Sequence, residues 1–438
     1  MIIEFKLANY RSVNAEQTLS FVAENARRHS DNLIPRPGYK LLKAAALFGA
    51  NASGKSNLVR AIGAMRDFVR DSATRMNDGD PIMLAEPFRL DPVAREAPSR
   101  FEITFVTQDT SYVYGFAVTR KRVESEWLTA RRGKSEARVC EFRRTFNGAT
   151  GEYAWDFDGF KKSDADQIRD RTLDNMLAFS VGPQQKVEAL RPAYRYLRDD
   201  IWAFNMSSGT DDISIRTALL CEESEGTQRK LSDLLHGADT GIENIWIEAD
   251  MDDPMPELPP KAGEQFQDAF QALKRLAASF PLPRVRATRR DASGEVVNFD
   301  FKADESQGTQ RFFAVAGQIL NALSSGTVVV IDELDASMHP LLTRRLLELF
   351  QSAEANPNGA QLLFTTHDAS LLDEGLFRRD QIWLAEKCDG ASTFFSLADI
   401  RPAVRNTESF LRNYLVGRYG GTPHLGRAFD DLAAGSKA

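Results

Sequence analysis

The chain has 438 residues, of which 42% are hydrophobic and 27% are charged. This is the composition of an ordinary globular protein, which excludes disordered and collagen-like classes, and the length allows one large core or two to three modest domains. The net charge of −7 argues against a protein that binds nucleic acid over its whole surface, although it leaves room for a local basic groove.

The first predicted elements are a strand, a turn and a second strand. Residues 2–7 are a short apolar run, and residues 8–12 (ANYRS) have the composition of a turn. Residues 44–48 are apolar and end at Gly49, which is typical of a buried strand that leads into a glycine turn. Apolar residues then recur at helical spacing through residues 57–65.

The middle of the chain changes from alternating to helical patterning. Residues 101–106 and 112–118 predict a pair of antiparallel strands joined by a short turn. Residues 162–280 are mainly helical in pattern, and we expect helices over 186–204 and 264–280.

The last third of the chain returns to alternating strands and helices. Residues 326–331 are a β-branched run, typical of a strand that is buried on both faces. A helix over 341–353 and a second buried strand over 361–366 follow. This alternation indicates an α/β domain with a parallel sheet, divided in the sequence by a helical insertion.

Residues 49–56 (GANASGKS) match the pattern G-x-x-x-x-G-K-[S/T] between a predicted strand and a predicted helix. The glycines let the loop turn so that its backbone N–H groups point at phosphate oxygens, and the helix that follows adds its dipole. Lys55 then reaches the β- and γ-phosphates, and the hydroxyl of Ser56 binds Mg²⁺. The alternative is a chance glycine turn, which we expect in on the order of one or two chains per hundred.

Asp332 and Glu333 end the β-branched strand. The backbone turns at the C-terminal end of a parallel strand, so both carboxylates can reach one site. Asp332 is suited to hold Mg²⁺, and Glu333 is suited to polarise an attacking water as a general base. The alternative is a pair of acids at a helix N-terminus, which the upstream phosphate loop makes less favoured. His367 follows the next strand, where it can sense a γ-phosphate, although a lone histidine is more often structural.

Together these motifs resemble those of the ABC-type ATPases. Residues 304–311 (DESQGTQR) look like a diverged signature motif directly before a helix. Ser306 and Gly308 match its phosphate-contacting positions, whereas Glu305 and Thr309 depart from the usual residues. In that family the signature contacts the nucleotide of the opposite subunit, which implies a homodimer or higher homo-oligomer with composite ATP sites.

Further residues resemble the RecF, SMC and OLD-type branch of these ATPases. They include NYRS at 9–12, GKSN at 54–57, DELD at 332–335 and HP at 339–340. We find no clear Q-loop glutamine, because the nearest candidate, Gln108, has the context of a hairpin turn. Other stretches resemble stand-alone bacterial ATPases of this branch, among them those of restriction-associated, PARIS and Septu anti-phage systems. They are residues 87–88, 112–116, 126–128 and 414–423.

The resemblance implies an α/β fold, namely an ABC-type P-loop ATPase head with a mixed sheet and an antiparallel lobe. The N-terminal half of the head would comprise residues 1–161, and the C-terminal half would comprise residues 281–438. Residues 162–280 between them would form a helical insertion or lid. No sustained heptads occur, so no long coiled coil is expected.

The resemblance also implies the site residues and the cofactors, which are ATP and Mg²⁺. The catalytic residues would be Lys55, Glu333 and His367, and the metal ligands would be Ser56 and Asp332, with Asp335 as a D-loop-like residue. The nucleotide-binding residues would be Gly49, Asn51, Ser53, Gly54, Lys55, Ser56, Asn57, Arg11, Ser306 and Gly308.

The resemblance implies a protein that assembles around ATP and thereby controls a separate effector, a nuclease or toxin from a neighbouring gene. Its biological role would be that of a sensor or scaffold in an anti-phage system. The residues after His367 are too few for the nuclease domain of OLD proteins, so we expect no nuclease activity in cis. A RecF-like DNA-binding ATPase is the alternative, and a transporter motor fits the long insertion poorly. Residues 120–144 and 284–290 are basic and favour the DNA alternative, unless they are solvated outer faces of strands.

The sequence also bears on compartment and partners. It has no run of about 18 apolar residues, no signal-peptide layout at its start, and three widely spaced cysteines. We therefore expect a cytoplasmic protein that does not enter a membrane. DNA or a phage protein is a further candidate partner.

Overall fold

The computed structural model describes residues 1–25, 29–36, 38–133, 137–206, 211–249, 283–372, 375–405 and 408–423. The helix predicted over 264–280 lies outside the described residues. The chain divides into two compact units. Unit 1 comprises Met1–Asn205, Ala322–Asp335 and Leu347–Ala438, and unit 2 comprises Met206–Asn321 and Ala336–Leu346. The three segments expected from the sequence stay a prediction about domains.

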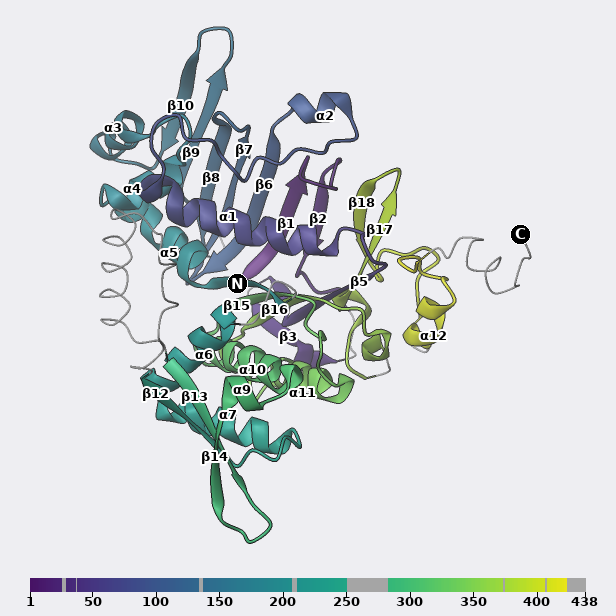
Figure 1. Ribbon diagram of the computed structural model, residues 1–438. Helices are drawn as coiled ribbons and strands as arrows, with labels where there is room; N and C mark the ends of the chain where they lie inside the picture. Colours follow the sequence, from purple (N-terminus) through teal and green to yellow (C-terminus); the bar gives the residue numbers. More distant parts are fainter. Residues whose placement is uncertain are drawn as a thin grey trace, which may run out of the picture. The chain divides into compact units, whose positions relative to one another are not determined.

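Unit 1 contains an antiparallel sheet with the strand order β10-β9-β8-β7-β6-β1-β2 (Figure 1). The two strands predicted over 101–106 and 112–118 are confirmed as parts of β6 and β7, which pair along their whole length. The bounds are β1 Ile2–Ala8, β2 Gln17–Ser20, β6 Ser99–Thr107, β7 Thr110–Val118, β8 Val123–Arg132, β9 Ala137–Asn147 and β10 Glu152–Asp158.

A second sheet of unit 1 has the order β11-β15-β16-β5-β17-β18, in which only β18 runs antiparallel to its neighbour. Every residue of β5, β15 and β16 is buried, which explains their continuous apolar runs. The predicted α/β head with an antiparallel lobe is thereby confirmed. The bounds are β5 Ala44–Gly49, β11 Ile201–Asn205, β15 Val328–Asp332, β16 Gln361–Thr365, β17 Ile382–Cys388 and β18 Ala391–Ser396.

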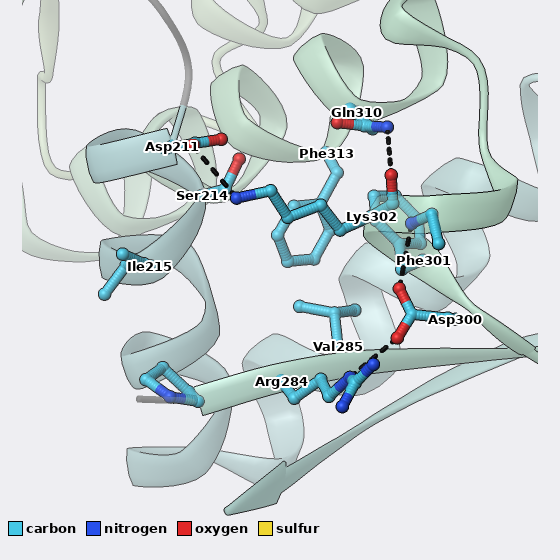
Figure 2. A pocket seen from close by; sticks show the side chains of 12 residues that line it. Asp211, Ser214, Ile215, Arg284, Val285, Asp300, Phe301, Lys302, Gln310 and Phe313 are labelled. Atoms are coloured by element: carbon cyan, nitrogen blue, oxygen red, sulfur yellow. Dashed lines mark hydrogen bonds and ion pairs between the residues drawn. The ribbon is translucent and has the colours of Figure 1, made fainter. Parts of the chain in front are cut away.

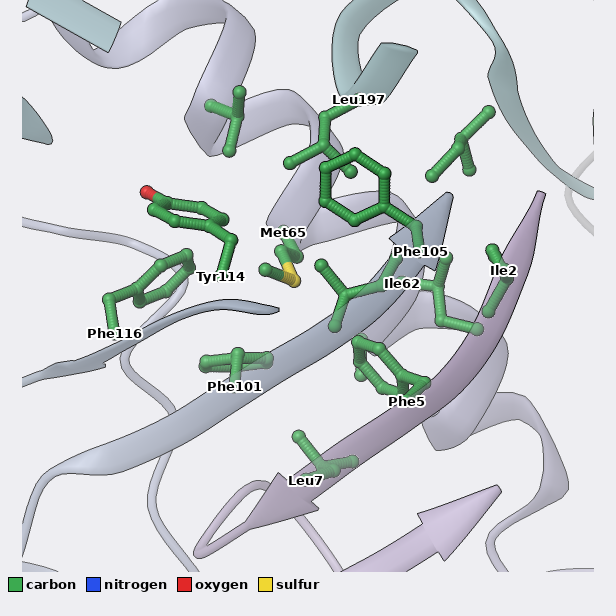
Figure 3. Close-up of a cluster of buried hydrophobic side chains, with 14 of the residues drawn as sticks. Ile2, Phe5, Leu7, Ile62, Met65, Phe101, Phe105, Tyr114, Phe116 and Leu197 are labelled. Atoms are coloured by element: carbon green, nitrogen blue, oxygen red, sulfur yellow. The ribbon is translucent and has the colours of Figure 1, made fainter. Parts of the chain in front are cut away.

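Helix α1 (Lys55–Arg75) contacts both of these sheets. Ile62 and Met65 of this helix join Phe5, Phe101 and Phe116 of the antiparallel sheet in one buried cluster (Figure 3). Each such side chain contributes about 1.5–3 kcal/mol by leaving water. The core therefore fixes the helix whose N-terminus carries the phosphate loop.

The helix predicted over 186–204 is wrong in its second half. Helix α5 (Arg191–Asp199) ends early, and Ile201–Asn205 form strand β11, which pairs in parallel with β15. Pairing with a buried strand here outweighs the local helical pattern, because Ile201, Trp202 and Phe204 suit a sheet as well as a helix. The remaining helices of unit 1 are α2 Pro92–Glu96, α3 Lys162–Arg171, α4 Ala178–Gln184 and α12 Phe410–Leu415, and its other strands are β3 Leu33–Arg36 and β4 Tyr39–Leu42.

Unit 2 combines helices with a small antiparallel sheet of order β12-β13-β14. Helices α6 and α7 pack on this sheet, and within the described ranges no helix is long enough for an extended coiled coil. Nor does any described helix combine the length and apolar character needed to cross a bilayer. The bounds are α6 Asp211–Glu223, α7 Glu225–Gly237, β12 Asn244–Ala249, β13 Pro283–Arg290, β14 Val296–Asp300 and α9 Phe301–Asp304. Helices α10 Gln307–Ser325 and α11 Pro340–Gln351 begin in unit 2, and their last residues belong to unit 1.

Candidate functional site

The phosphate loop connects β5 to α1, and Lys55 is the first residue of that helix. The Lys55 ammonium is buried and donates to the carbonyl oxygens of Gly49 at 2.9 Å and Ala50 at 3.0 Å. It therefore lies across the loop, in the position from which it can exchange two carbonyl partners for phosphate oxygens.

The loop has the shape and the unused polar groups of a phosphate cradle. The Oγ of Ser53 is buried and has no hydrogen-bond partner among the described residues. A Cβ on Gly49 would lie 2.6 Å from the carbonyl oxygen of Ala385, so only glycine fits there. Ala52 has a left-handed backbone with φ of 61°. These features fit Mg²⁺-bound ATP, for which Asn51, Ser53 and Ser56 remain proposed ligands.

Asp332 and Glu333 are oriented by a residue that the sequence did not point out. The hydroxyl of Thr365, at the end of β16, donates to Asp332 Oδ1 at 2.7 Å and accepts from the backbone N–H of Glu333 at 2.8 Å. Asp332 is 1% exposed, and Glu333 has a left-handed backbone with φ of 57°. This uncommon backbone conformation at Glu333 turns the chain at the end of β15. Such a turn is needed if the carboxylates of Asp332 and Glu333 are to reach one site.

The predicted catalytic groups share one electrostatic environment. Burial lowers the pKa of Lys55, and three nearby carboxylates act in the opposite direction. These are Asp332, Glu333 and Asp335. Partial burial lowers the pKa of His367, Lys55 lowers it further, and the same carboxylates raise it. The backbone N–H of His367 also donates to Asp335 Oδ2 at 3.3 Å. The structure thus brings together residues far apart in the sequence.

Two residues of the predicted nucleotide site have other partners in the structure. The Arg11 guanidinium pairs with Glu86 Oε1 at 2.8 Å, and its backbone N–H donates to the carbonyl oxygen of Glu86. The Asn57 amide donates to Ser12 Oγ at 2.7 Å. The proposed nucleotide contacts of Arg11 and Asn57 stay predictions.

Gln108 lies in the turn between β6 and β7, as its sequence context predicts. Asn205 is the amide residue that lies beside Asp332, because the parallel register of β11 and β15 pairs these two residues. Asn205 is absent from the predicted site residues because the helix expected over 186–204 ends directly before it. A short run of aromatic and β-branched residues just before it was the available signal.

The diverged signature begins helix α10 in unit 2. Ser306 caps this helix, accepting from the backbone N–H of Thr309 at 3.2 Å. A Cβ on Gly308 would lie 2.7 Å from the carbonyl oxygen of Ser337, so the glycine is required by close packing. Glu305, which departs from the usual leucine, forms a 2.7 Å ion pair with Arg289. The departure therefore has a local structural cause.

The arginines of residues 284–290 are engaged within unit 2. They form the ion pairs Arg284–Asp300, Arg286–Glu248, Arg289–Glu305 and Arg290–Glu243. Residues 120–144 are also partly neutralised, since Arg138 pairs with Asp158 and Arg144 with Glu126. Such pairing leaves the arginines of residues 284–290 with little net charge for a phosphate backbone, and it favours the structural interpretation of that segment.

Unit 2 also contains a cavity of about 470 Å³ beside the start of α10 (Figure 2). Phe301 and Phe313, whose ring centroids are 4.9 Å apart, form part of its apolar wall. At its rim Lys302 pairs with Asp211 at 3.0 Å. Because Arg284, the other cation of the rim, is paired with Asp300, the cavity suits a phosphate group less well than the loop at Lys55 does.

The role of Thr365 leads to a first prediction. Thr365→Val keeps the shape of the buried side chain but removes the hydroxyl that bonds the Asp332 carboxylate and the Glu333 backbone N–H. Because a hydrogen bond to a charged group contributes about 1.5–3 kcal/mol, we expect kcat for ATP hydrolysis to fall by roughly 10- to 100-fold with little change in KM. Thr343→Val is the matched control, because the buried Thr343 hydroxyl has no partner among the described residues. Equal kcat values for the two variants would remove Thr365 from the site.

Residues 44–373, most of the chain, match the family model described as "AAA domain, putative AbiEii toxin, Type IV TA system". The chain belongs to this family, and the domain at the phosphate loop is therefore an AAA-type ATPase domain.

Solved structures of Smc heads are similar to the chain at low identity. One is described as "the SmcHead bound to the C-winged helix domain of ScpA"; it has 13% identity and a TM-score of 0.44, covering 90% of this chain and 97% of that chain. Another is an Smc head domain with a coiled coil and joint derived from Pyrococcus yayanosii, with 12% identity, a TM-score of 0.32, and coverage of 90% and 96%. No curated protein matches the chain.

Proposed function

We propose that the protein is a Mg²⁺-dependent ATP hydrolase of the ABC type whose ATP-bound assembly controls a separate effector. The main observation that supports ATP hydrolysis is that Lys55, Asp332, Glu333 and His367 lie close enough to interact electrostatically. They do so at the carboxyl edge of the parallel strands of one sheet. Ligands bind at this edge in open α/β sheets.

Each residue has a distinct part in the proposed reaction. Lys55 and the backbone N–H groups of the loop bind and orient the β- and γ-phosphates. Ser56 and Asp332 would hold Mg²⁺, which neutralises phosphate charge when it is bound. Glu333 accepts a proton from the attacking water, held in place by the Thr365 hydroxyl on its backbone N–H. His367 contacts the γ-phosphate.

The proposed active site is composite, with Ser306 and Gly308 of one chain completing the phosphate loop of another. Two facts support this. Ser306 is exposed at the N-terminus of α10, a 19-residue helix, and Gly308 packs on the Ser337 backbone, so this segment is rigid and open. A helix N-terminus attracts phosphate through its free N–H groups and its dipole.

A mixing experiment tests the composite site. We expect Lys55→Ala and Ser306→Arg chains to be inactive alone and to regain activity when mixed. Random pairing gives heterodimers in half of the complexes, each with one intact site, so the mixture should reach about a quarter of the wild-type rate. The measurement is phosphate release, with Ser293→Arg, in an exposed turn, as the control. The composite site is contradicted if the mixture stays inactive, or if the Ser306→Arg chain hydrolyses ATP on its own.

The proposed effector is a nuclease or toxin encoded nearby, in an anti-phage sensor or scaffold. A role in such a system is supported by the description of the family to which residues 44–373 belong, which names a putative toxin of a toxin–antitoxin system, and by the resemblance to anti-phage ATPases. A pull-down from the native host with the Glu333→Gln variant and ATP tests it. Recovery of a neighbouring-gene product supports the proposal, and recovery of DNA alone would favour the RecF-like alternative.

A further inference from the structure

The turn at residues 9–12 meets the phosphate loop through Ser12 rather than through Arg11. The Asn57 amide and the Ser392 hydroxyl each donate to Ser12 Oγ at 2.7 Å. The backbone N–H of Ser392 also donates to the carbonyl oxygen of Ser12 at 2.7 Å. One hydrogen-bond network therefore joins α1, the N-terminal turn and strand β18.

This hydrogen-bond network lies directly against Gly54. Gly54 has a φ of 105°, a conformation that favours glycine. A Cβ at this position would lie 2.9 Å from Ser12 Oγ and would also collide with the side chain of Ser392. The two serines therefore set the position of the backbone immediately before Lys55 and Ser56.

Loss of Ser12 and loss of Ser392 would break different numbers of these hydrogen bonds. A hydroxyl oxygen has two acceptor sites, and Ser12 uses both, one for Asn57 and one for Ser392. Ser392 is 1% exposed, so loss of Ser12 leaves its buried hydroxyl without this partner. Loss of Ser392, by contrast, leaves the bond between Asn57 and Ser12 intact. Ser12 is thus the central member of the group.

We propose that Ser12 and Ser392 are positioning residues of the nucleotide site, which hold Gly54 so that the loop N–H groups and the Ser56 hydroxyl keep the geometry that binds Mg²⁺-bound ATP. The proposal rests on the proposed ATPase function. It differs from the resemblance-based expectation, which placed Arg11 of the same turn at the nucleotide. It also couples the loop to β18, although Ser12 and Ser392 are 380 positions apart.

The test measures binding of ATPγS with Mg²⁺ by calorimetry and the KM for ATP. Since a hydrogen bond contributes a factor of about three at the lower end of its usual range, and the Ser12 hydroxyl makes two, we expect Ser12→Ala to weaken binding about tenfold and Ser392→Ala about threefold. The double variant should match Ser12→Ala, because the two substitutions share one hydrogen bond. Ser12→Thr keeps the hydroxyl and should bind within about twofold of wild type, and it carries the test if Ser12→Ala does not fold.

Ser396→Ala is the matched control. Ser396 is buried on the same strand, but its hydroxyl contacts the carbonyl oxygen of Arg379 and the backbone N–H of Ala398. We expect it to lower Tm while leaving the Kd for ATPγS unchanged. If the Ser12 and Ser392 variants lower Tm in the same way and keep wild-type affinity, the serines are structural and the proposal is overturned.

The two proposals fail in different ways. Folded wild-type protein that binds no ATPγS overturns the ATPase function and the positioning role with it. Wild-type protein that binds ATPγS without hydrolysing ATP overturns the hydrolase alone, and the affinities of the serine variants still decide the positioning role.

Discussion

Glu333→Gln is expected to lower the rate of ATP hydrolysis by about 10²- to 10⁴-fold, the usual contribution of a positioned general base. Glutamine keeps the size of the side chain and the backbone N–H that donates to Thr365. Lys55 and the phosphate loop are unchanged, so ATP should still bind. The variant is therefore expected to accumulate in the ATP-bound, assembled state.

Phosphate release and size-exclusion chromatography with ATP measure the two halves of this expectation. Glu354→Gln is the control, because it makes the same change at an exposed carboxylate outside the site. Hydrolysis at the wild-type rate would show that Glu333 is not the base. Asp335 would then be the next residue to test, since its Oδ1 is buried and has no partner among the described residues.

The local motifs were predictable because each depends on neighbouring residues. A glycine turn, a lysine and a helix start must follow one another within a few positions, so residues 49–56 define their own geometry. Asp332 and Glu333 were predictable for a similar reason, because a buried β-branched run indicates a parallel strand and ligands gather at the carboxyl ends of such strands.

The residues that were missed act through contacts with distant parts of the chain. Thr365 orients the carboxylates only because β16 lies beside β15, and Ser392 reaches the loop only because β17 and β18 continue the sheet beyond β5. Asn205 was hidden by a helical pattern that strand pairing overrides. Strand order is not written in local periodicity, so these neighbours became visible only in the fold.

The second large effect is expected at Glu126, a carboxylate inside the antiparallel lobe. Glu126 and Arg144 are both fully buried and form an ion pair at 3.1 Å. Burial raises the pKa of Glu126 despite this partner. Glu126 also accepts from the backbone N–H groups of Ala178 at 2.8 Å and Phe179 at 2.9 Å. One carboxylate thus neutralises a buried guanidinium and caps helix α4.

Glu126→Gln is expected to lower the free energy of unfolding by about 3–5 kcal/mol, because it leaves the buried charge of Arg144 uncompensated. In addition, one backbone N–H of α4 then faces an NH₂ group, which cannot accept a hydrogen bond. Urea denaturation measures the loss. Arg138→Ala, which breaks an exposed ion pair on the same strand as Arg144, is the control and should have a far smaller effect.

A double substitution separates the two roles of Glu126. If charge compensation is the whole role, replacing Glu126 and Arg144 by leucine and methionine should restore stability, because apolar pairs often replace buried ion pairs without loss. The N–H groups of α4 would still lack their acceptor, so we expect only partial recovery. Full recovery would show that the cap contributes little. Partial recovery would bear on function as well, because Ser180 of α4 donates to the carbonyl oxygen of Val69 at 2.7 Å and so holds α1, the helix that begins at Lys55.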